Sequence, residues 1–542
     1  MLVSSSGDVV ITNDGATILH EMSVQHPGGK LIVEVAETQD GEVGDGTTTA
    51  TVLVGSLMEE AERLLAQEVH PTIIANGYQL GMEKALAILD ELAISVGFGD
   101  RDDLLKIADT AMTGKSIEAV KDKVAGIVVD AVLQVASKTD QGTYVVDEDD
   151  IKIRMQVGDS MHDAELIRGV VIDKQRVFEQ MPEKVRDAKV ALLALPLEVT
   201  KTQVKSKIKI TSSDQMKAFS EQERESLRKL ADQIVASGAN VVLCQKGIAD
   251  AVQYFLAKHG IYAVEDVNEN DMKFAAKALC GTIVNKPEEL NAATLGHAEK
   301  AGEVPDTDLT VISGCDNPKA VTILLRGTSQ LLLDELERAV YDATRVVQDA
   351  IEDGKFVVGG GSVETELQMR IRDYAATVGG RVQLAIEAFA NSFEIIPRTL
   401  AENSGFDTID KVVDMRKVHA DGAKYAGLNV YTGEVVDMRE AGVIEPLRVK
   451  TQAIKSATET APAGEDPGDQ ECDRDGHAPR PRRRHDGYPD RKAGPTVSHP
   501  REEARKITTS SSSIFLSCGR LLPRQKISAA SGLSPKERRA AS

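Results

Sequence analysis

Residues 44–49 are the part of this sequence best suited to chemistry. They read Gly-Asp-Gly-Thr-Thr-Thr and precede a run of leucines at helical spacing. Glycines at a helix start let the backbone approach an anion, and the free N–H groups and helix dipole favour negative charge there. The threonine hydroxyls could donate to phosphate oxygens, and Asp45 could ligate a hard cation such as Mg²⁺. The same residues also suit a plain helix after a glycine turn, capped by Thr47 or Thr48.

Three other stretches carry glycine or charge in short, distinctive patterns. Residues 13–19 read Asn-Asp-Gly-Ala-Thr-Ile-Leu, residues 356–361 Phe-Val-Val-Gly-Gly-Gly, and residues 442–450 Gly-Val-Ile-Glu-Pro-Leu-Arg-Val-Lys. Two single charges also stand out, Asp342 in an amphipathic helical pattern and Lys115 in a Thr-Gly-Lys-Ser segment. Judged by residue type alone, each of these two charges is an ordinary solvated surface side chain.

The elements that must position these residues begin with a mostly helical region over about the first hundred residues. Two short β-prone runs, 8–12 and 16–19, flank Asn-Asp-Gly and predict a hairpin or a tight turn. Apolar spacing then predicts helices that end near residues 37, 65, 92 and 112. Helical patterns return over three later stretches, at 331–353, 362–378 and 384–404.

The middle of the chain has a different pattern. Residues 144–195 are rich in short strand-like runs, and beyond residue 211 strands and helices alternate, which indicates an α/β module. Residues 206–229 are polar and predict a protruding segment that ends in a long helix. Because helical regions lie on both sides of this middle part, we expect a discontinuous domain that the chain leaves and re-enters.

Composition excludes several classes of function. The 542 residues carry 85 acidic and 64 basic side chains, a net charge of −21, which argues against nucleic acid or an anionic membrane as a partner. Aromatic residues make up only 4% and Trp is absent, so a base-stacking platform is unexpected. The five cysteines have no paired spacing, and we find neither a secretory signal nor an apolar run of membrane-spanning length. These features predict a cytoplasmic protein.

Residues 461–542 differ in character from the rest of the chain. They are rich in Pro, Gly, Arg and Ser, carry 16 basic against 11 acidic residues, and show no helical or strand period. We expect this tail to be disordered and foreign to the acidic body, as an out-of-frame terminus would be. An RNA-binding tail is the alternative that its Pro-Arg-Pro-Arg-Arg-Arg run at 479–484 leaves open.

Taken together, the four stretches resemble those of the chaperonin family. Residues 44–50 look like the nucleotide-binding signature of chaperonins, and the other three stretches match in the family's order across residues 1–460. The segments at 208–230 and 240–247 are similar to the group II, archaeal thermosome branch, in which a helical protrusion forms a built-in lid. The sequence is therefore identified as a member of that branch.

The resemblance implies a multi-domain chaperonin fold. We expect a mostly α-helical, discontinuous equatorial domain, a small α+β intermediate domain, and an α/β apical domain with a helical protrusion. The implied segments are equatorial at 1–100 and 356–460, intermediate at 101–165 and 319–355, and apical at 166–318 with the lid around 205–230. Residues 461–542 lie outside the resemblance.

The resemblance also implies roles at the phosphate end of a bound nucleotide. Asp45 would hold Mg²⁺, and Gly46, Thr47, Thr48 and Thr49 would bind the phosphates of ATP. The implied cofactors are therefore ATP and Mg²⁺.

Five further residues receive roles from the same resemblance. Asp342 would position or activate the attacking water, and Asp14 would place a carboxylate near the γ-phosphate, which suits phosphoryl transfer. Lys115 would sense the γ-phosphate as a point charge. Gly360 would let the backbone approach the nucleotide closely, and Glu445 would accept from the ribose hydroxyls.

The implied protein is an ATP-driven folding chamber. Its partners would be other chaperonin subunits, in a homo- or hetero-oligomeric double ring, and unfolded client proteins, with no separate co-chaperonin lid. Family chains carry a Leu-Gly-Pro-Lys-Gly phosphate loop ahead of the position of Met1 and an apolar helix where Pro462 and Gly464 stand here. We expect both departures to weaken assembly, so a non-catalytic or assembly-impaired subunit is one alternative. A plain Mg²⁺-dependent phosphotransferase is another.

Overall fold

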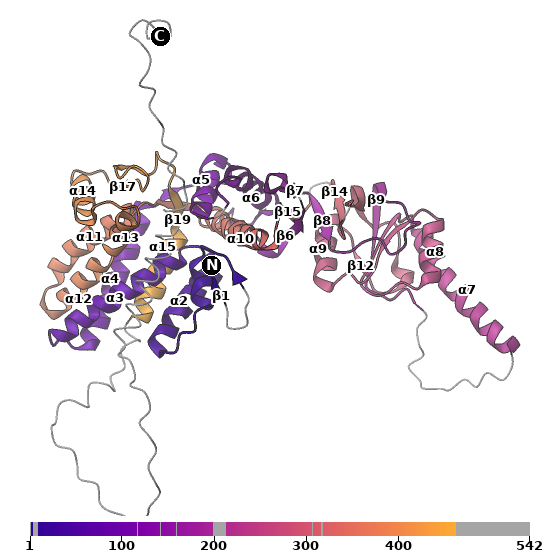
Figure 1. Cartoon of the computed structure of the whole chain (residues 1–542), viewed down its shortest axis with the longest axis horizontal. Helices are drawn as coiled ribbons and strands as arrows, with labels where there is room; N and C mark the ends of the chain where they lie inside the picture. Colours follow the sequence, from indigo (N-terminus) through magenta and orange to yellow (C-terminus); the bar gives the residue numbers. More distant parts are fainter. Residues whose placement is uncertain are drawn as a thin grey trace, which may run out of the picture.

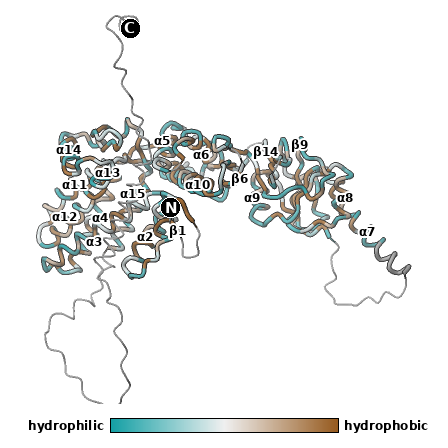
Figure 2. The backbone as a smooth tube through the Cα atoms, viewed as in Figure 1, coloured by the Kyte–Doolittle hydropathy of each residue, from teal (hydrophilic) through white to brown (hydrophobic). Residues whose placement is uncertain are grey.

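The computed structural model describes residues 2–3, 9–115, 117–140, 142–158, 160–198, 213–305, 307–315 and 318–461. These residues form three bodies in a row, which we call the base, middle and outer bodies (Figure 1). Hydrophobic segments run through the interior of all three (Figure 2). Within the described part of the chain, no helix is long and apolar enough to cross a membrane. Residues 462–542 of the predicted tail and residues 205–212 of the predicted lid lie outside the described residues.

The base body is a helical bundle made from both ends of the described chain. Its core joins fully buried side chains from early helices, such as Leu57, to side chains from late ones, such as Phe389. A Cβ added to Gly81 would lie 2.6 Å from the Phe389 ring, so this glycine lets two helices pack closely. The elements of the base body are β1 (Leu2–Val3), β2 (Val9–Val10), α1 (Gly15–His20), α2 (Pro27–Val43), α3 (Thr47–Ala66), α4 (Pro71–Leu92), β3 (Ile94–Ser95), β16 (Lys355–Val358), α11 (Ser362–Val378), α12 (Gly380–Ser392), α13 (Ile395–Asn403), α14 (Thr408–Ala420), β17 (Ala426–Leu428), β18 (Val435–Asp437), β19 (Ile444–Pro446) and α15 (Leu447–Thr460).

The middle body packs three helices on a small sheet. Strand β15 lies at the centre of this sheet, parallel to β6 and antiparallel to β7. The long helix α10 buries an apolar stripe, including Leu336, Val340 and Val347, against the same core. The elements of the middle body are α5 (Arg101–Met112), α6 (Lys121–Val135), β4 (Ser137–Lys138), β5 (Tyr144–Val145), η1 (Glu148–Asp150), β6 (Ile151–Val157), η2 (Met161–Asp163), β7 (Glu165–Ile167), β15 (Val321–Gly327) and α10 (Gln330–Asp353).

The outer body is an α/β unit around a mixed sheet of strand order β11-β10-β9-β13-β14-β8, with β12 also paired to β9. Strands β9, β10 and β11 run parallel, and β13, β14 and β8 continue antiparallel. Helix α7 extends away from this sheet (Figure 1). The elements of the outer body are β8 (Gly169–Ile172), β9 (Lys184–Leu193), α7 (Ser213–Ser237), β10 (Val241–Cys244), α8 (Asp250–Lys258), β11 (Tyr262–Val264), α9 (Glu269–Leu279), β12 (Ile283–Val284), η3 (Pro287–Glu289), β13 (Gly296–Glu303) and β14 (Thr310–Ser313).

Two local predictions were wrong. The run at 16–19, predicted as a strand, lies in helix α1, because the Asp14 side chain accepts from Thr17 N and caps a helix instead of closing a hairpin. The single helix predicted at 384–404 is divided into α12 and α13, with Phe393 as the C-cap of the first. The predicted fold class, a discontinuous helical domain with inserted α+β and α/β parts, is confirmed.

Candidate functional site

The Gly-Asp-Gly turn between α2 and α3 leaves the start of α3 without a side-chain cap. Gly44 (φ 75°) ends α2, and Gly46 (φ 77°) takes the N-cap position of α3, where no side chain bonds to the helix start. The prediction that Thr47 or Thr48 caps this helix is therefore wrong. The helix does follow a glycine turn, as the alternative expected, but it has no side-chain cap, so a phosphate would supply acceptors for its first N–H groups.

The side chain of Asp45 lies in this turn with one described hydrogen bond. Its Oδ1 accepts from Gly46 N at 2.7 Å. Burial raises the pKa of Asp45, and the ammonium of Lys115 opposes that shift. Within the described ranges, no three His, Cys, Asp or Glu side chains are grouped as a ready-made metal site. Asp45 therefore fits a cation such as Mg²⁺, which commonly takes one or two carboxylates and completes its shell with phosphate oxygens and water.

Asp14 caps α1 directly beside the start of α3. Its Oδ2 accepts from Thr17 N at 2.8 Å and from Thr17 Oγ1 at 2.6 Å. A Cβ added to Gly15 would lie only 2.5 Å from Thr48 Oγ1, so the starts of the two helices touch. The structure thus brings the Asp14 carboxylate to the edge of the uncapped helix start, where a cation could bind between it and a bound anion.

Lys115 and Asp342 form a buried ion pair that joins the loop after α5 to α10. Their side chains are 13% and 9% exposed, so neither is the solvated surface charge that its residue type suggested. Burial raises the pKa of Asp342 to about 7, while the adjacent ammonium of Lys115 lowers it. Burial lowers the pKa of Lys115, but Asp342 and Asp45 more than offset this and the net shift is upward. Asn13 Nδ2 donates to Gly114 O at 3.1 Å and ties this loop to the Asp14 turn.

Asp40 is an acidic residue of this cluster that the sequence reasoning missed. Burial raises its pKa, and the carboxylates of Asp14 and Asp45 add to the shift while Lys115 opposes it. The signal was present, because Asp40 stands five residues before Asp45 in the last turn of α2. Asp40 thus joins the carboxylates that interact electrostatically with the Lys115 ammonium, while Arg345 also acts on Asp40. A bound cation would further offset this negative charge.

Gly360 and Glu445 lie on the other side of the site, where β16 and β19 pair. Val357 faces Glu445 in the register of these strands, and a Cβ added to Gly359 would lie 3.5 Å from Glu445 Oε1. Gly360 has φ 67°, and a Cβ there would lie 2.9 Å from Met438, so only glycine fits. Burial raises the pKa of Glu445 to about 7, and the neighbouring ammonium of Lys450 opposes the shift.

The two groups of residues form one continuous site. Gln39 Nε2 donates to Asp45 O at 2.8 Å and to Val449 O at 3.2 Å, and a Cβ added to Gly46 would lie 2.7 Å from Val449 Cγ1. All ten residues singled out from the sequence therefore lie around one junction of base and middle bodies. They are Asp14, Asp45, Gly46, Thr47, Thr48, Thr49 in the first turn of α3, Lys115, Asp342, Gly360 and Glu445.

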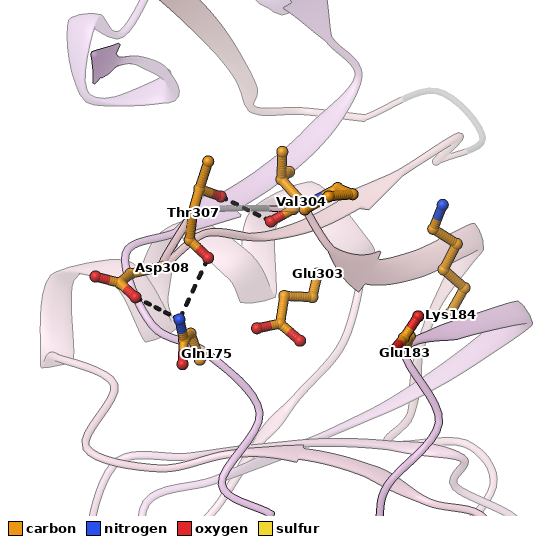
Figure 3. A pocket seen from close by; sticks show the side chains of 8 residues that line it. Gln175, Glu183, Lys184, Glu303, Val304, Thr307 and Asp308 are labelled. Atoms are coloured by element: carbon orange, nitrogen blue, oxygen red, sulfur yellow. Dashed lines mark hydrogen bonds between the residues drawn. The ribbon is translucent and has the colours of Figure 1, made fainter. Parts of the chain in front are cut away.

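Two surface depressions are distinct from this group. One, of about 390 Å³, lies in the outer body, where Glu303 faces the gap between Gln175 and Lys184 (Figure 3). Its Gln175 side chain donates to Asp308, and none of the ten residues lines it. The other, of about 320 Å³, runs along α1 and α2 past Leu19 and Val33.

A discontinuous helical base, a middle body bearing an Asp on a long helix, and an α/β outer body with a projecting helix define a chaperonin subunit. The sequence model of the TCP-1/cpn60 chaperonin family matches residues 1–463, and the chain belongs to that family. Group II chaperonins are ATP-dependent molecular chaperones, and the similarity of this chain to archaeal thermosome subunits and to a group II chaperonin structure assigns it to that group.

The relatives are archaeal thermosome subunits. The chain is 52% identical to thermosome subunit alpha of Archaeoglobus fulgidus over 463 residues, which cover 85% of each chain. It is 52% identical to the thermosome subunit of Methanopyrus kandleri, again over 85% of both chains. Among solved structures, it is similar to the open-state monomer of a group II chaperonin from Methanococcoides burtonii, with a TM-score of 0.58 and 45% identity. That match covers 78% of this chain and 99% of the other.

Proposed function

We propose that this chain is a ring-forming ATPase subunit that folds non-native proteins in a chamber closed by its own outer body. The main support for the proposed ATPase activity is the buried Lys115–Asp342 ion pair, which lies beside the uncapped start of α3. It brings one ammonium and one carboxylate from the middle body to the anion-binding end of a base helix. Phosphoryl transfer needs that combination of charge neutralisation and positioning.

The phosphates would bind at the start of α3. Gly46 would offer close backbone approach, while Thr47, Thr48 and Thr49 would donate N–H and hydroxyl groups. Asp45 would hold Mg²⁺, whose charge would offset that of the phosphate oxygens. The left-handed turn at Gly46 and the absence of a side-chain cap in the described structure support this assignment.

The remaining residues would act around the transferred group and the ribose. Asp342 would accept a proton from the attacking water or orient it, with Asp14 contributing negative charge near the cation. Lys115 would move from Asp342 toward the γ-phosphate. Gly360 would allow close backbone approach to the nucleotide, and Glu445 would accept from the ribose hydroxyls. The burial of Asp342 and the position of Glu445 beside Gly359 support these roles.

The three bodies would serve as the chaperonin domains. We assign residues 1–100 and 356–460 to the equatorial domain, 101–165 and 319–355 to the intermediate domain, and 166–318 to the apical domain with its lid around 205–230. Subunits of this or related chains would form a cytoplasmic double ring, and no separate co-chaperonin would be needed. Unfolded clients would be isolated in the chamber, where their apolar surfaces cannot meet and aggregate.

The ATPase is tested by Asp342→Asn in the full chain. We expect kcat to fall by roughly 10²–10⁴-fold, because the variant cannot accept a proton, while the Kd for Mg-ATP stays within about threefold. Asp334→Asn is the matched control, since Asp334 lies on the same helix and its carboxylate accepts from Gln330 at 2.7 Å outside the site. Normal hydrolysis by Asp342→Asn would overturn the assignment. Refolding of a denatured client should fail in the same variant.

A further inference from the structure

A buried lysine stands between the two ends of the proposed nucleotide site. Lys450, in the first turn of α15, places Nζ 2.6 Å from Glu364 Oε1 and 3.1 Å from Glu445 Oε1. Lys450 and Glu364 are only 7% and 3% exposed. Removing one partner from such a buried ion group leaves an uncompensated charge, so the three side chains constrain one another strongly.

The group holds two carboxylates and one ammonium, and the two carboxylates are not equivalent. Apart from its ion pair with Lys450, the Glu364 carboxylate has no hydrogen-bond partner in the described part of the chain, so it serves only to anchor the ammonium. Glu445 is 16% exposed at its side chain and lies beside Gly359. Glu445 is therefore the carboxylate that remains able to meet a ligand.

The backbone next to Lys450 is fixed to the proposed metal turn. Gln39 is fully buried, and its Nε2 bridges Asp45 O and Val449 O. The Val449 side chain packs against Gly46. A shift of the Lys450 backbone would therefore disturb both the Asp45 turn and the Glu445 carboxylate.

We propose that Lys450 is a positioning residue for nucleotide binding, which holds the Glu445 carboxylate where it accepts from ribose hydroxyls while Glu364 anchors the ammonium from the opposite side. This inference rests on the proposed function, because it takes the ligand to be a ribonucleotide. A positioned Glu445 should make the site select ribonucleotides over deoxyribonucleotides. The chain should prefer ATP over 2′-deoxy-ATP and 3′-deoxy-ATP because a positioned, buried acceptor loses a hydrogen bond when a hydroxyl is missing.

The experiment measures KM and kcat of the full chain for ATP and for the two deoxy nucleotides. We expect the unsubstituted chain to show a KM roughly tenfold lower for ATP, as the loss of a hydrogen bond to a buried acceptor predicts. Glu445→Gln should reduce that preference to about threefold or less, with kcat for ATP changed much less than KM. The double variant Lys450→Met/Glu364→Gln keeps the net charge of the group at −1 and should lose the preference to the same extent.

Matched variants separate positioning from mere stability. Lys355→Met removes a lysine that lies outside the site, where its Nζ is 2.5 Å from Asp90 Oδ1. This variant should keep the tenfold preference. Lys450→Arg keeps the buried positive charge but places it on a longer, planar guanidinium group. This variant should fold, and its preference for ATP should fall from tenfold to about threefold. If the double variant fails to fold, an unchanged preference in Lys450→Arg overturns the inference.

The outcomes also distinguish the inference from its premise. If Glu445→Gln keeps the full preference, or if the unsubstituted chain shows none, Glu445 has no ribose role and that part of the proposed function fails. If Glu445→Gln loses the preference but Lys450→Met/Glu364→Gln keeps it, only the positioning role of Lys450 is wrong. Loss of the preference in both variants, with the preference kept in Lys355→Met, supports the inference.

Discussion

At the residue scale, Gly46 meets two constraints that any side chain would violate. Its φ of 77° costs an L-residue about 1–2 kcal/mol, and a Cβ would lie 2.7 Å from Val449 Cγ1. We expect Gly46→Ala to weaken Mg-ATP binding by at least roughly tenfold, because Val449 must move and the start of α3 moves with it. Isothermal titration calorimetry measures this directly.

Gly405→Ala is the control for Gly46→Ala. Gly405 has the same φ of 77°, but no atom lies within 4 Å of an added Cβ. It should therefore cost a similar amount of stability and leave Mg-ATP binding unchanged. Equal nucleotide affinity in the two variants would show that the contact of Gly46 with Val449 has no bearing on the site.

The sequence could name residues of the site but could not give their partners. The Gly-Asp-Gly-Thr pattern marks a helix start that the chemistry of glycine and threonine already suggests. The ion pair of Lys115 with Asp342 joins residues 227 positions apart, and Gln39 reaches Val449 across 410 positions. Nothing local to Asp342 distinguishes it from an exposed acid, since its burial depends on how α10 packs against the base body. Such contacts are tertiary, and a single sequence does not encode them in any spacing.

At the element scale, the contact between α10 and α15 should make stability depend on pH. Burial raises the pKa of Asp349 on α10 to about 7, against the pull of Arg448 on α15, from the usual value of 3.8. The folded chain therefore binds this proton more tightly than the unfolded chain. The stabilisation is complete below pH 4 and is lost as pH rises through 7, with an upper limit of about 4 kcal/mol for a shift of this size.

Asp349→Asn tests this dependence. The variant cannot titrate, so its thermal midpoint should fall less than that of the unsubstituted chain between pH 5 and pH 8. Arg448 keeps Glu352 and Asp353 as partners, which should preserve the contact itself. Circular dichroism melts at several pH values give the two slopes, and parallel curves would mean that Asp349 is already ionised across this range.

The type of an element could be predicted where apolar residues repeat at helical spacing over many turns. It could not be predicted where a side-chain cap outweighs the propensity of a few residues. The stripe of α10 and the run of α3 follow helical spacing over five or more turns, and both helices form as predicted. Over 16–19, β-prone residues are too few to outweigh a carboxylate that caps a helix at Asp14. The division of α12 from α13 near Phe393 had a sequence signal that the prediction did not use. Pro397 lies in the first turn of α13 and lacks the N–H that would bond to the Phe393 carbonyl in a continuous helix.

At the scale of the whole molecule, the long helix α10 couples the middle body to the end of α2, next to the proposed metal turn of the base body. Arg345, one turn after Asp342, donates to Gly41 O at 2.7 Å and to Glu42 O at 3.2 Å, both at the end of α2. The same guanidinium pairs with Glu148 of the middle body. Because Asp342 and Arg345 share one face of α10, a rotation of the middle body would move the proposed catalytic carboxylate and release these carbonyls together.

The outer body is held to the middle body by a different charge cluster, which yields the last prediction. Asp271 on α9, only 4% exposed, pairs with Lys152 and with Arg154 at 2.9 Å, both on β6. Asp271→Asn would leave two half-buried cations facing each other, at a cost near the lower end of roughly 3–5 kcal/mol. We expect amide exchange in α9 and β6 to accelerate by at least about tenfold, as the two bodies separate more often.

The control for Asp271→Asn lies on the same helix. Glu269 pairs with Lys273 at 2.7 Å within α9, and both side chains are well exposed, at 67% and 63%. Such a surface pair is worth about 0–1 kcal/mol, so Glu269→Gln should leave exchange in β6 unchanged. Because β6 belongs to the middle body, faster exchange there in Asp271→Asn alone means that the cluster holds the two bodies together. Equal exchange in both variants would mean that the apolar contacts between the bodies suffice, and that the buried charges set only their orientation.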